Sequence, residues 1–268
     1  MRIIDKFSLF LRLLRLVRNW PIYFFNRFGF IRTGTVTYKL RNGIKISSRP
    51  FSIDRSALND VWLEESYSPS HCGIKWDWAG CKTIIDIGAN IGTFTLYAAI
   101  NAPGATVYAM EPEPGNYGML IQNIRQNGLS KRVTTLQAAM SGAAGNAILH
   151  ISPHVSGGHS LFKHSSTGAD AVTVNIMTLG DLLSEKKIDV CDFLKLDCEG
   201  AEYEILYSLP AETLNKIRCI AVECHLFSGN PLHRPEKLKM FLEEKGFDVR
   251  PLKKSMYLAT RAADLSLR

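Results

Sequence analysis

TIIDIGANIGTFTLYAA, residues 83–99, decides the fold of this chain of 268 residues. An apolar, β-branched run reaches Asp86, turns through Gly88 and Gly92, and continues as an apolar segment with helical spacing. The pattern predicts a buried parallel strand, a tight glycine turn and a helix. In that geometry the backbone N–H groups of the turn approach a ligand at the carboxyl end of the strand.

The spacing of the turn separates two classes of ligand. A dinucleotide fingerprint requires G-x-G-x-x-G, but here Asn90 replaces the second glycine and the pattern is D-x-G-x-x-x-G. This disfavours a dehydrogenase and favours a nucleoside without phosphates, such as S-adenosylmethionine. A second apolar strand ends at Glu111, where an open α/β sheet places a carboxylate for ribose hydroxyls. The predicted cofactor-binding residues are Asp86, Gly88, Asn90, Gly92 and Glu111.

Strands alternate with helical segments through the rest of the chain. After the strand at 105–110, the expected strands are 133–139, 146–151, 171–176, 191–197, 217–225, 247–250 and 256–260. Their order predicts an α/β fold of the class I, Rossmann-like methyltransferase type, with a mostly parallel seven-stranded sheet and an antiparallel edge strand. We place this S-adenosylmethionine-binding domain at 79–268 and an N-terminal cap at 1–78. The cap is expected to contain a basic amphipathic helix, a hairpin and a further helix at 54–67.

The basic charge of the chain is concentrated at its N-terminus. Residues 1–49 contain eleven Lys or Arg against the single acid Asp5, whereas the rest of the chain contains 21 basic and 24 acidic residues. Residues 1–20 have helical spacing, with too many arginines for a transmembrane span and no small-residue cleavage site. This segment is expected either to lie on an anionic membrane or to pack on the domain or a second subunit of a homodimer. The expected location is cytoplasmic, with membrane association at the cytoplasmic face as the alternative.

Four further motifs accompany the glycine turn. The chain resembles the FkbM family of S-adenosylmethionine-dependent methyltransferases over about residues 36–250. The resemblance rests on DIGANIG at 86–92, EPEP at 111–114, LKLDCEGAE at 194–202, VECH at 222–225 and, more weakly, RPFSID at 49–54. Gly180 stands where the family usually has an acid. The resemblance implies O-methylation of a saccharide, glycolipid or natural product.

Methyl transfer to a hydroxyl needs a base, because a hydroxyl is a weak nucleophile. Asp197, Glu199, Glu223 and His225 follow the ends of two predicted neighbouring strands, on the crevice side of the sheet. We predict that His225 is the general base, that Glu223 orients its ring or binds substrate, and that Asp197 faces the methyl donor or the acceptor oxygen. Glu199 is assigned to the substrate.

Two further expectations concern the same crevice. The four groups Asp197, Glu199, Glu223 and His225 would alternatively hold a divalent ion such as Mg²⁺. The polar insertion 152–170 is expected to be a loop that shapes acceptor choice, with Ser160 as a substrate residue.

The sequence therefore predicts an O-methyltransferase with a small-molecule or glycan acceptor. An RNA or protein methyltransferase is the first alternative, but the 79–268 domain lacks the basic balance that nucleic acid attracts. A non-catalytic cofactor-binding scaffold recruited to membranes is the second. The six cysteines are scattered without C-x-x-C pairs, which indicates reduced thiols.

Overall fold

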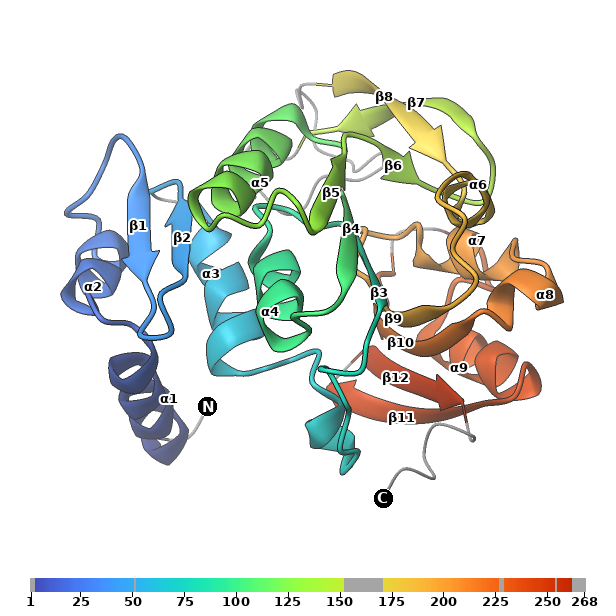
Figure 1. Cartoon of the computed structure of the whole chain (residues 1–268), viewed down its shortest axis with the longest axis horizontal. Coiled ribbons are helices and arrows are strands. Elements are labelled where there is room, and N and C mark those ends of the chain that lie inside the picture. The colour runs from blue at the N-terminus through green and yellow to red at the C-terminus, as the bar shows by residue number, and fades with distance from the viewer. Residues whose placement is uncertain (1–2, 51, 152–170, 227–228, 254, 262–268) are drawn as a thin grey trace.

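The computed structural model describes residues 3–50, 52–151, 171–226, 229–253 and 255–261, with side chains from Ser8 onward. Within these residues a seven-stranded sheet forms the centre of the molecule (Figure 1). Its strands, in spatial order, are β5 (Val133–Leu136), β4 (Thr106–Met110), β3 (Thr83–Ile87), β9 (Cys191–Leu196), β10 (Ile217–Glu223), β12 (Met256–Arg261) and β11 (Phe247–Lys253).

Six of these strands run in the same direction and β12 runs against them, pairing antiparallel with both β10 and β11. The predicted class I methyltransferase fold is confirmed by this order. One detail differs from the sequence analysis: the antiparallel strand lies one place inside the edge. β11 and β12 form a hairpin, and its second strand, β12, pairs with β10. β11 is therefore the edge strand.

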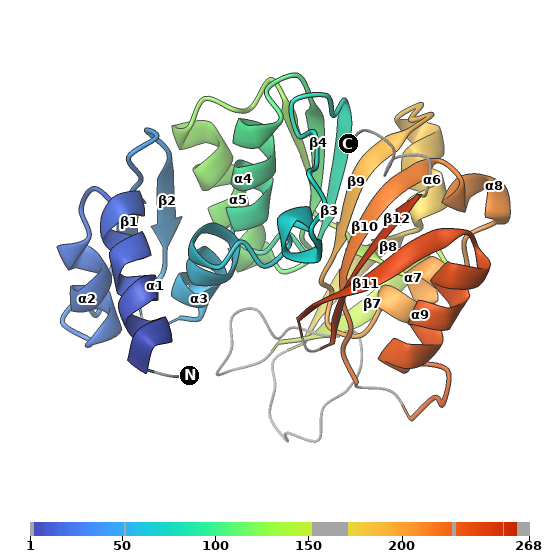
Figure 2. The same ribbon diagram turned by 90° about the horizontal axis from the view of Figure 1, so that it is seen from below.

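Helices cover both faces of the sheet (Figure 2). One face is covered by α4 (Thr93–Asn101) and α5 (Pro114–Gln126), and the other by α6 (Leu179–Glu185), α7 (Glu202–Tyr207), α8 (Ala211–Leu214) and α9 (Pro235–Glu244). The central strands are buried on both sides, and all six residues of β9 are buried. This is why these strands are continuous apolar runs in the sequence.

A small second sheet lies beyond β5. It consists of β6 (Ala139–Met140), β8 (Ala171–Met177) and β7 (Gly145–His150), in that order. The expected strand 133–139 is therefore divided: β5 ends at Leu136 and the chain enters this second sheet at Ala139. The predicted loop 152–170, with Ser160, lies outside the described residues.

The N-terminal residues form two helices, a hairpin and a third helix. These are α1 (Ile3–Leu16), α2 (Pro21–Arg27), β1 (Val36–Lys39), β2 (Lys45–Ser48) and α3 (Asp54–Leu58). The hairpin turns at Asn42–Gly43, as the sequence predicts, and Gly43 has a φ of 93°. The expected helix 54–67 is shorter than predicted, because α3 changes to a π-helical turn at Asn59–Leu63.

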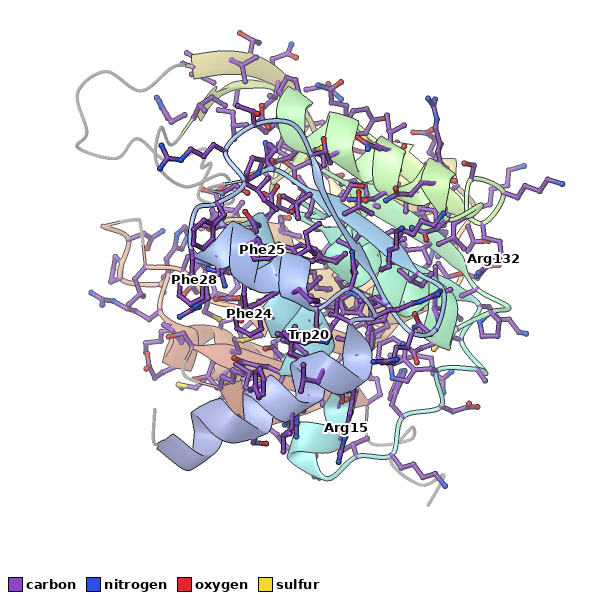
Figure 3. All side chains as sticks on the ribbon, turned by 90° about the vertical axis from the view of Figure 1, so that its left-hand side faces the viewer. Arg15, Trp20, Phe24, Phe25, Phe28 and Arg132 are labelled. Atoms are coloured by element: carbon purple, nitrogen blue, oxygen red, sulfur yellow. The ribbon has the colours of Figure 1, made fainter. Side chains whose placement is uncertain are left out.

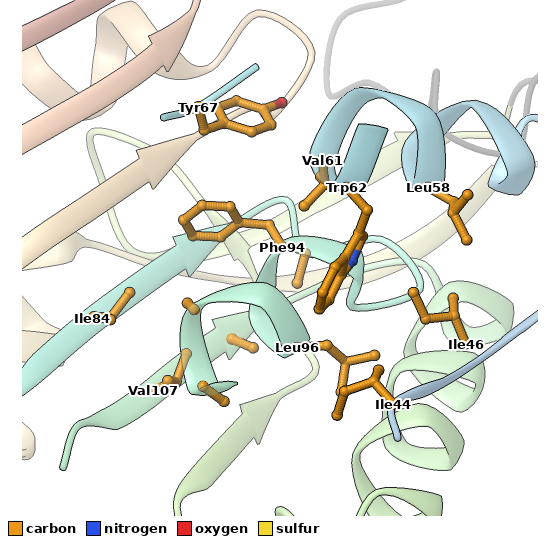
Figure 4. Close-up of a cluster of buried hydrophobic side chains, with 14 of the residues drawn as sticks. Ile44, Ile46, Leu58, Val61, Trp62, Tyr67, Ile84, Phe94, Leu96 and Val107 are labelled. Atoms are coloured by element: carbon orange, nitrogen blue, oxygen red, sulfur yellow. The ribbon is translucent and has the colours of Figure 1, made fainter. Parts of the chain in front are cut away.

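These N-terminal elements share one core with the sheet domain (Figure 4). Trp62 packs edge-on against Tyr97 of α4, and its indole N–H donates to the carbonyl of Thr93 over 3.1 Å. The open edge of β2 is bonded by amide side chains of α5, since the Ser47 N–H donates to Asn123 Oδ1 over 2.7 Å. The cap is therefore fixed to the domain by apolar packing and by hydrogen bonds. Among the described helices, none has both the length and the apolar character needed to cross a bilayer.

Candidate active site

A cavity of about 250 Å³ lies at the carboxyl ends of β3, β4, β9 and β10. One wall comes from the glycine turn after β3, a second from α3 and the π-helical turn, and a third from the loops after β9 and β10. Five acids and two bases line it: Asp60, Glu111, Asp197, Glu199 and Glu223, with Lys195 and His225. The cavity is thus strongly acidic.

The glycine turn brings two loops into direct contact. Gly88 has a φ of 74°, and a Cβ atom there would lie 1.7 Å from the carbonyl oxygen of Asp197. Only glycine permits this approach of the β3 turn to the end of β9. Asn90 is also left-handed, with a φ of 52°, and its side-chain Oδ1 is buried without a hydrogen-bond partner in the described structure. Because Asn90 lines the cavity, this oxygen is an acceptor prepared for a ligand.

Glu111 closes the other side of this turn. Its Oε2 accepts from the Asn90 N–H over 2.8 Å, and its Oε1 accepts from the Glu113 N–H over 3.0 Å. Burial raises the pKa of Glu111 to about 7, against the opposing effect of these hydrogen bonds. The carboxylate is only 5% exposed but lines the cavity, where its remaining lone pairs can accept from hydroxyls.

Two of the predicted cofactor residues lie behind the cavity wall. Asp86 is fully buried, accepts from the Thr95 hydroxyl over 2.6 Å and pairs with Lys195 Nζ at 3.2 Å. Gly92, with a φ of 87°, forms the start of α4 against Leu120. The sequence places Asp86 at a strand end but does not show that Lys195 of the adjacent strand neutralises it. Gly88, Asn90 and Glu111 are therefore the predicted residues that line the cavity.

Asp197 is held by two partners. The Tyr67 hydroxyl donates to Asp197 Oδ2 over 2.9 Å and lies 3.3 Å from Glu223 Oε2, so that it joins the ends of β9 and β10. Lys195 Nζ lies 3.6 Å from the same Asp197 oxygen. Although burial lowers the pKa of Lys195, the charges of Asp86 and Asp197 raise it above its ordinary value. Burial and the charge of Asp197 raise the pKa of Glu223.

Glu202, rather than Glu223, orients the ring of His225, and the alternative that Glu223 binds substrate stays a prediction. Its Nδ1 lies 2.8 Å from Oε1 of Glu202, a fully buried residue in the first turn of α7. Glu202 also accepts from the N–H groups of Cys198 and Gly200, which fixes the carboxylate. Glu202 therefore fixes the orientation of the imidazole, and Glu223 faces Tyr67 instead.

The charges around His225 bear on its predicted role as general base. Burial lowers its pKa, but the hydrogen bond and charge of Glu202, with the charges of Asp197 and Glu199, raise it to about 10. A pKa of about 10 keeps a proton on the ring at neutral pH, which favours a neighbouring carboxylate as the general base.

Glu199 has the properties of such a base. Its Oε2 lies 3.7 Å from His225 Nε2, and burial raises the pKa of Glu199 to about 7 despite the opposing charge of His225. Its backbone is left-handed, with a φ of 53°, a conformation that is uncommon for glutamate. Such local strain concentrates at functional sites. A carboxylate with a pKa near neutrality is suited to taking a proton from an acceptor.

The alternative of a divalent ion fits the donor set less well. One ligand atom each from Asp197, Glu199 and His225 lies within 4.8 Å of the others. However, Mg²⁺ prefers oxygen ligands in octahedral geometry, and His225 would first have to lose its proton. One oxygen of Asp197 already accepts from Tyr67. We therefore derive no step through a metal.

The structure adds three residues that the sequence analysis did not assign to the site: Tyr67, Lys195 and Glu202. Tyr67 is 130 positions from Asp197, and no local pattern links them. Lys195 is visible as a lone charge inside an apolar strand, which is a signal for a buried pair. Glu202 lies in the first turn of α7, where the helix dipole favours an acid. The sequence therefore gives no further sign that Glu202 contacts the site.

Comparison with known proteins agrees with this arrangement. Residues 86–249 match the family model described as the methyltransferase FkbM domain. The methyltransferase sdnD of Sordaria araneosa is 32% identical over 62% of this chain and 73% of its own length. The 31-O-demethyl-FK506 methyltransferase FkbM of Streptomyces tacrolimicus is 29% identical over 54% of this chain and 66% of its own length. The hexuronic acid methyltransferase AglP of Haloferax volcanii is 26% identical over 52% of this chain and 54% of its own length.

The family match covers the turn after β3, Glu111 and the acidic ends of β9 and β10, the same segments that line the cavity. The chain belongs to the FkbM family of S-adenosylmethionine-dependent methyltransferases.

Proposed function

We propose that this methyltransferase acts on a hydroxyl group of a saccharide, glycolipid or other natural product. The observation that carries the proposal is Glu199, a carboxylate with a pKa near 7 that lines the cavity, 3.7 Å from the imidazole of His225. A hydroxyl needs such a base, whereas a neutral amine already presents its lone pair. Two relatives, a 31-O-demethyl-FK506 methyltransferase and a hexuronic acid methyltransferase, support a hydroxyl-rich acceptor by their names.

The cavity fits the expected methyl donor at three points. Gly88 admits a close approach of backbone, Glu111 offers carboxylate oxygens for ribose hydroxyls, and the unpartnered Oδ1 of Asn90 can accept from an ammonium or amine. S-adenosylmethionine, when bound, supplies an activated methyl group. The surrounding acids favour its positive sulfonium and disfavour a phosphate-bearing ligand.

In this proposal Glu199 accepts the proton of the acceptor hydroxyl. With S-adenosylmethionine bound, its methyl group would pass to that oxygen as the bond between the methyl carbon and sulfur breaks, and S-adenosylhomocysteine would leave. His225, fixed by Glu202, stands beside Glu199 and holds its orientation. Asp197, fixed by Tyr67 and Lys195, accepts a hydrogen bond from a neighbouring hydroxyl of the acceptor molecule and so aligns it. Alignment and proton removal are the two tasks that the protein must perform, since the sulfonium already activates the carbon.

The test is transfer of isotopically labelled methyl groups to a panel of sugars, uronic acids and hydroxylated natural products, with RNA and peptides as further arms. Once an acceptor is found, Glu199→Gln should lower kcat by about 10²–10⁴-fold while the affinity for S-adenosylmethionine changes little. Wild-type kcat/KM should rise with pH through about 7, as Glu199 loses its proton, and this rise should be absent in the variant.

Glu185→Gln, an exposed change on α6, is the matched control and should retain full activity. Label entering only RNA or peptide would refute the hydroxyl acceptor. A Glu199→Gln variant with unchanged kcat would remove Glu199 as the base.

A further inference from the structure

The N-terminal region exposes a row of large aromatic side chains. Trp20, Phe25, Phe28 and Phe30 are exposed by 38%, 53%, 66% and 74% of their surface. We call these four residues the N-terminal aromatic surface. Figure 3 shows three of them, Trp20, Phe25 and Phe28, along α2, with Arg15 of α1 nearby. Exposed aromatic side chains grouped in this way mark an interaction site rather than ordinary surface.

The other face of α2 is firmly packed, so the exposed row is not a sign of a loosely placed helix. Tyr23 and Asn26 are buried, and Asn26 Nδ2 donates to the Tyr38 hydroxyl over 2.6 Å. On the exposed side the rings pack mainly on one another. Phe24 stacks on Phe28 with centroids 6.3 Å apart, and Phe25 lies edge-on to Phe30 at 6.1 Å.

The charges around this surface have one sign. Between Ser8 and Lys45 the sequence contains eight Lys or Arg and no Asp or Glu. All eight are exposed: Arg12, Arg15, Arg18, Arg27, Arg32, Lys39, Arg41 and Lys45. A second copy of the chain docked through the same face would place these cations against one another. Aromatic rings surrounded by Lys and Arg are instead typical of surfaces that bind anionic lipid.

We propose that the N-terminal aromatic surface and its surrounding arginines bind an anionic lipid membrane. The phenyl rings enter the interfacial region of the bilayer, where Trp is also favoured, and the arginines contact lipid phosphates and carboxylates. The sequence analysis offered membrane binding by residues 1–20 as one alternative, with packing on the domain or on a second subunit as the other. We centre the proposed membrane surface on residues 15–32, because Leu13 and Val17 of the first segment are buried in the core.

The proposed membrane surface is mechanically linked to the cavity. The Tyr23 hydroxyl of α2 lies 2.9 Å from Asn59 Oδ1 and accepts from Arg55 over 3.0 Å. Arg55 belongs to α3, whose neighbouring residues Ser56 and Ala57 line the cavity. Binding through α2 therefore fixes the orientation of the cavity relative to the bilayer.

The test is flotation of the full chain with vesicles of phosphatidylcholine containing about one-third phosphatidylserine, compared with pure phosphatidylcholine. The wild type should float with the anionic vesicles only. Changing Arg15, Arg18 and Arg27 together to Ser should lower the partition coefficient about 100-fold, since each cation near the surface contributes about fivefold. Changing Phe25, Phe28 and Phe30 together to Ser should lower it about tenfold or more.

Two matched triple variants are the controls. Lys75, Lys131 and Lys237 changed to Ser remove three exposed cations elsewhere, and Ile148, Val190 and Met240 changed to Ser remove three exposed apolar side chains elsewhere. Both should float like the wild type. Thermal unfolding and calorimetry with S-adenosylmethionine show whether each variant is folded.

The proposal fails if the wild type does not float with anionic vesicles, or if the control variants lose as much binding as the N-terminal ones. It also fails if sedimentation shows a self-associated wild type that the phenylalanine variant dissociates, with no flotation, because the surface is then a subunit interface. The readout is binding alone, so a failure here leaves the proposed hydroxyl acceptor untouched.

Discussion

The cavity and the N-terminal aromatic surface are opposite in nearly every physical property. The cavity gathers five acids around two cations. The N-terminal region exposes eight cations and five large aromatic rings, without an acid between Ser8 and Lys45. The net charge of +7 describes neither region, because it is the sum of a basic surface and a slightly acidic domain. The net charge of a chain indicates its ligands only when the charged residues are located on particular surfaces or cavities of the structure.

The two regions also differ in how tightly their side chains are fixed. In the cavity, removal of one group leaves a buried partner uncompensated, so single changes should be costly. On the N-terminal surface each side chain faces solvent, so single changes should be tolerated by the fold and be felt only in binding. Three variants test this difference, in order of decreasing effect on stability.

Gly88→Ala should have the largest effect. The new Cβ would lie 1.7 Å from the carbonyl oxygen of Asp197, which must move, and the left-handed φ of 74° adds strain. We expect a loss of about 4 kcal/mol or more in the free energy of unfolding, measured by denaturant titration. Gly118→Ala, in an open position of α5, is the control and should stabilise by roughly 0.5–1 kcal/mol. Equal stability of the two variants would show that the β3 turn and the end of β9 do not touch.

His225→Gln should have an intermediate effect that depends on pH. The folded-state pKa of His225 is about 10, above the ordinary value of 6.5, so its protonation stabilises the fold fully below about pH 6.5. This contribution is lost as the pH rises through about 10. The variant should therefore be less stable than the wild type by roughly 3 kcal/mol at pH 6, and this deficit should shrink toward pH 10.

Chemical denaturation over this pH range measures the deficit directly. Glu202→Gln, which removes the partner of Nδ1, should show the same dependence on pH. His71→Gln, an exposed histidine in the N-terminal cap, should follow the wild type. A deficit for His225→Gln that is constant with pH would mean that its imidazole is not an ion-paired cation.

The sequence predicted the glycine-turn half of the cavity better than the acidic half. The strand, turn and helix of 83–99 are local, and their spacing alone places Gly88 and Asn90 on the cavity. The partners of the acids are distant in sequence: Tyr67 reaches Asp197 across 130 positions and Glu202 reaches His225 across 23. A charge pattern shows which groups are present but not how they pair.

Pairing bears on the roles that sequence reasoning assigned to Asp86 and His225. Asp86 stands at the end of a strand that touches the cavity, but Lys195 on the neighbouring strand turns it inward and neutralises it. His225 stands at the expected place, yet four acids in and around its loop keep it protonated: Glu202, Asp197, Glu199 and Glu223. The identity of a side chain gives its ordinary pKa, and only the neighbours determine whether it is a base or a cation.

The smallest effect on stability should come from the N-terminal surface itself. Phe28→Ser combined with Phe30→Ser removes side chains that are 66% and 74% exposed, and should change the free energy of unfolding by less than about 0.5 kcal/mol. Leu13→Ala, on the buried face of the same region with 3% exposure, should lose roughly 2–4 kcal/mol. Denaturant titration of both variants, with calorimetry for S-adenosylmethionine, separates the two faces. If the phenylalanine variant is destabilised as much as Leu13→Ala, the rings serve the fold of the single chain. The rings would then not be available to bind a membrane, and the proposed difference between a tightly paired cavity and a tolerant N-terminal surface would be wrong.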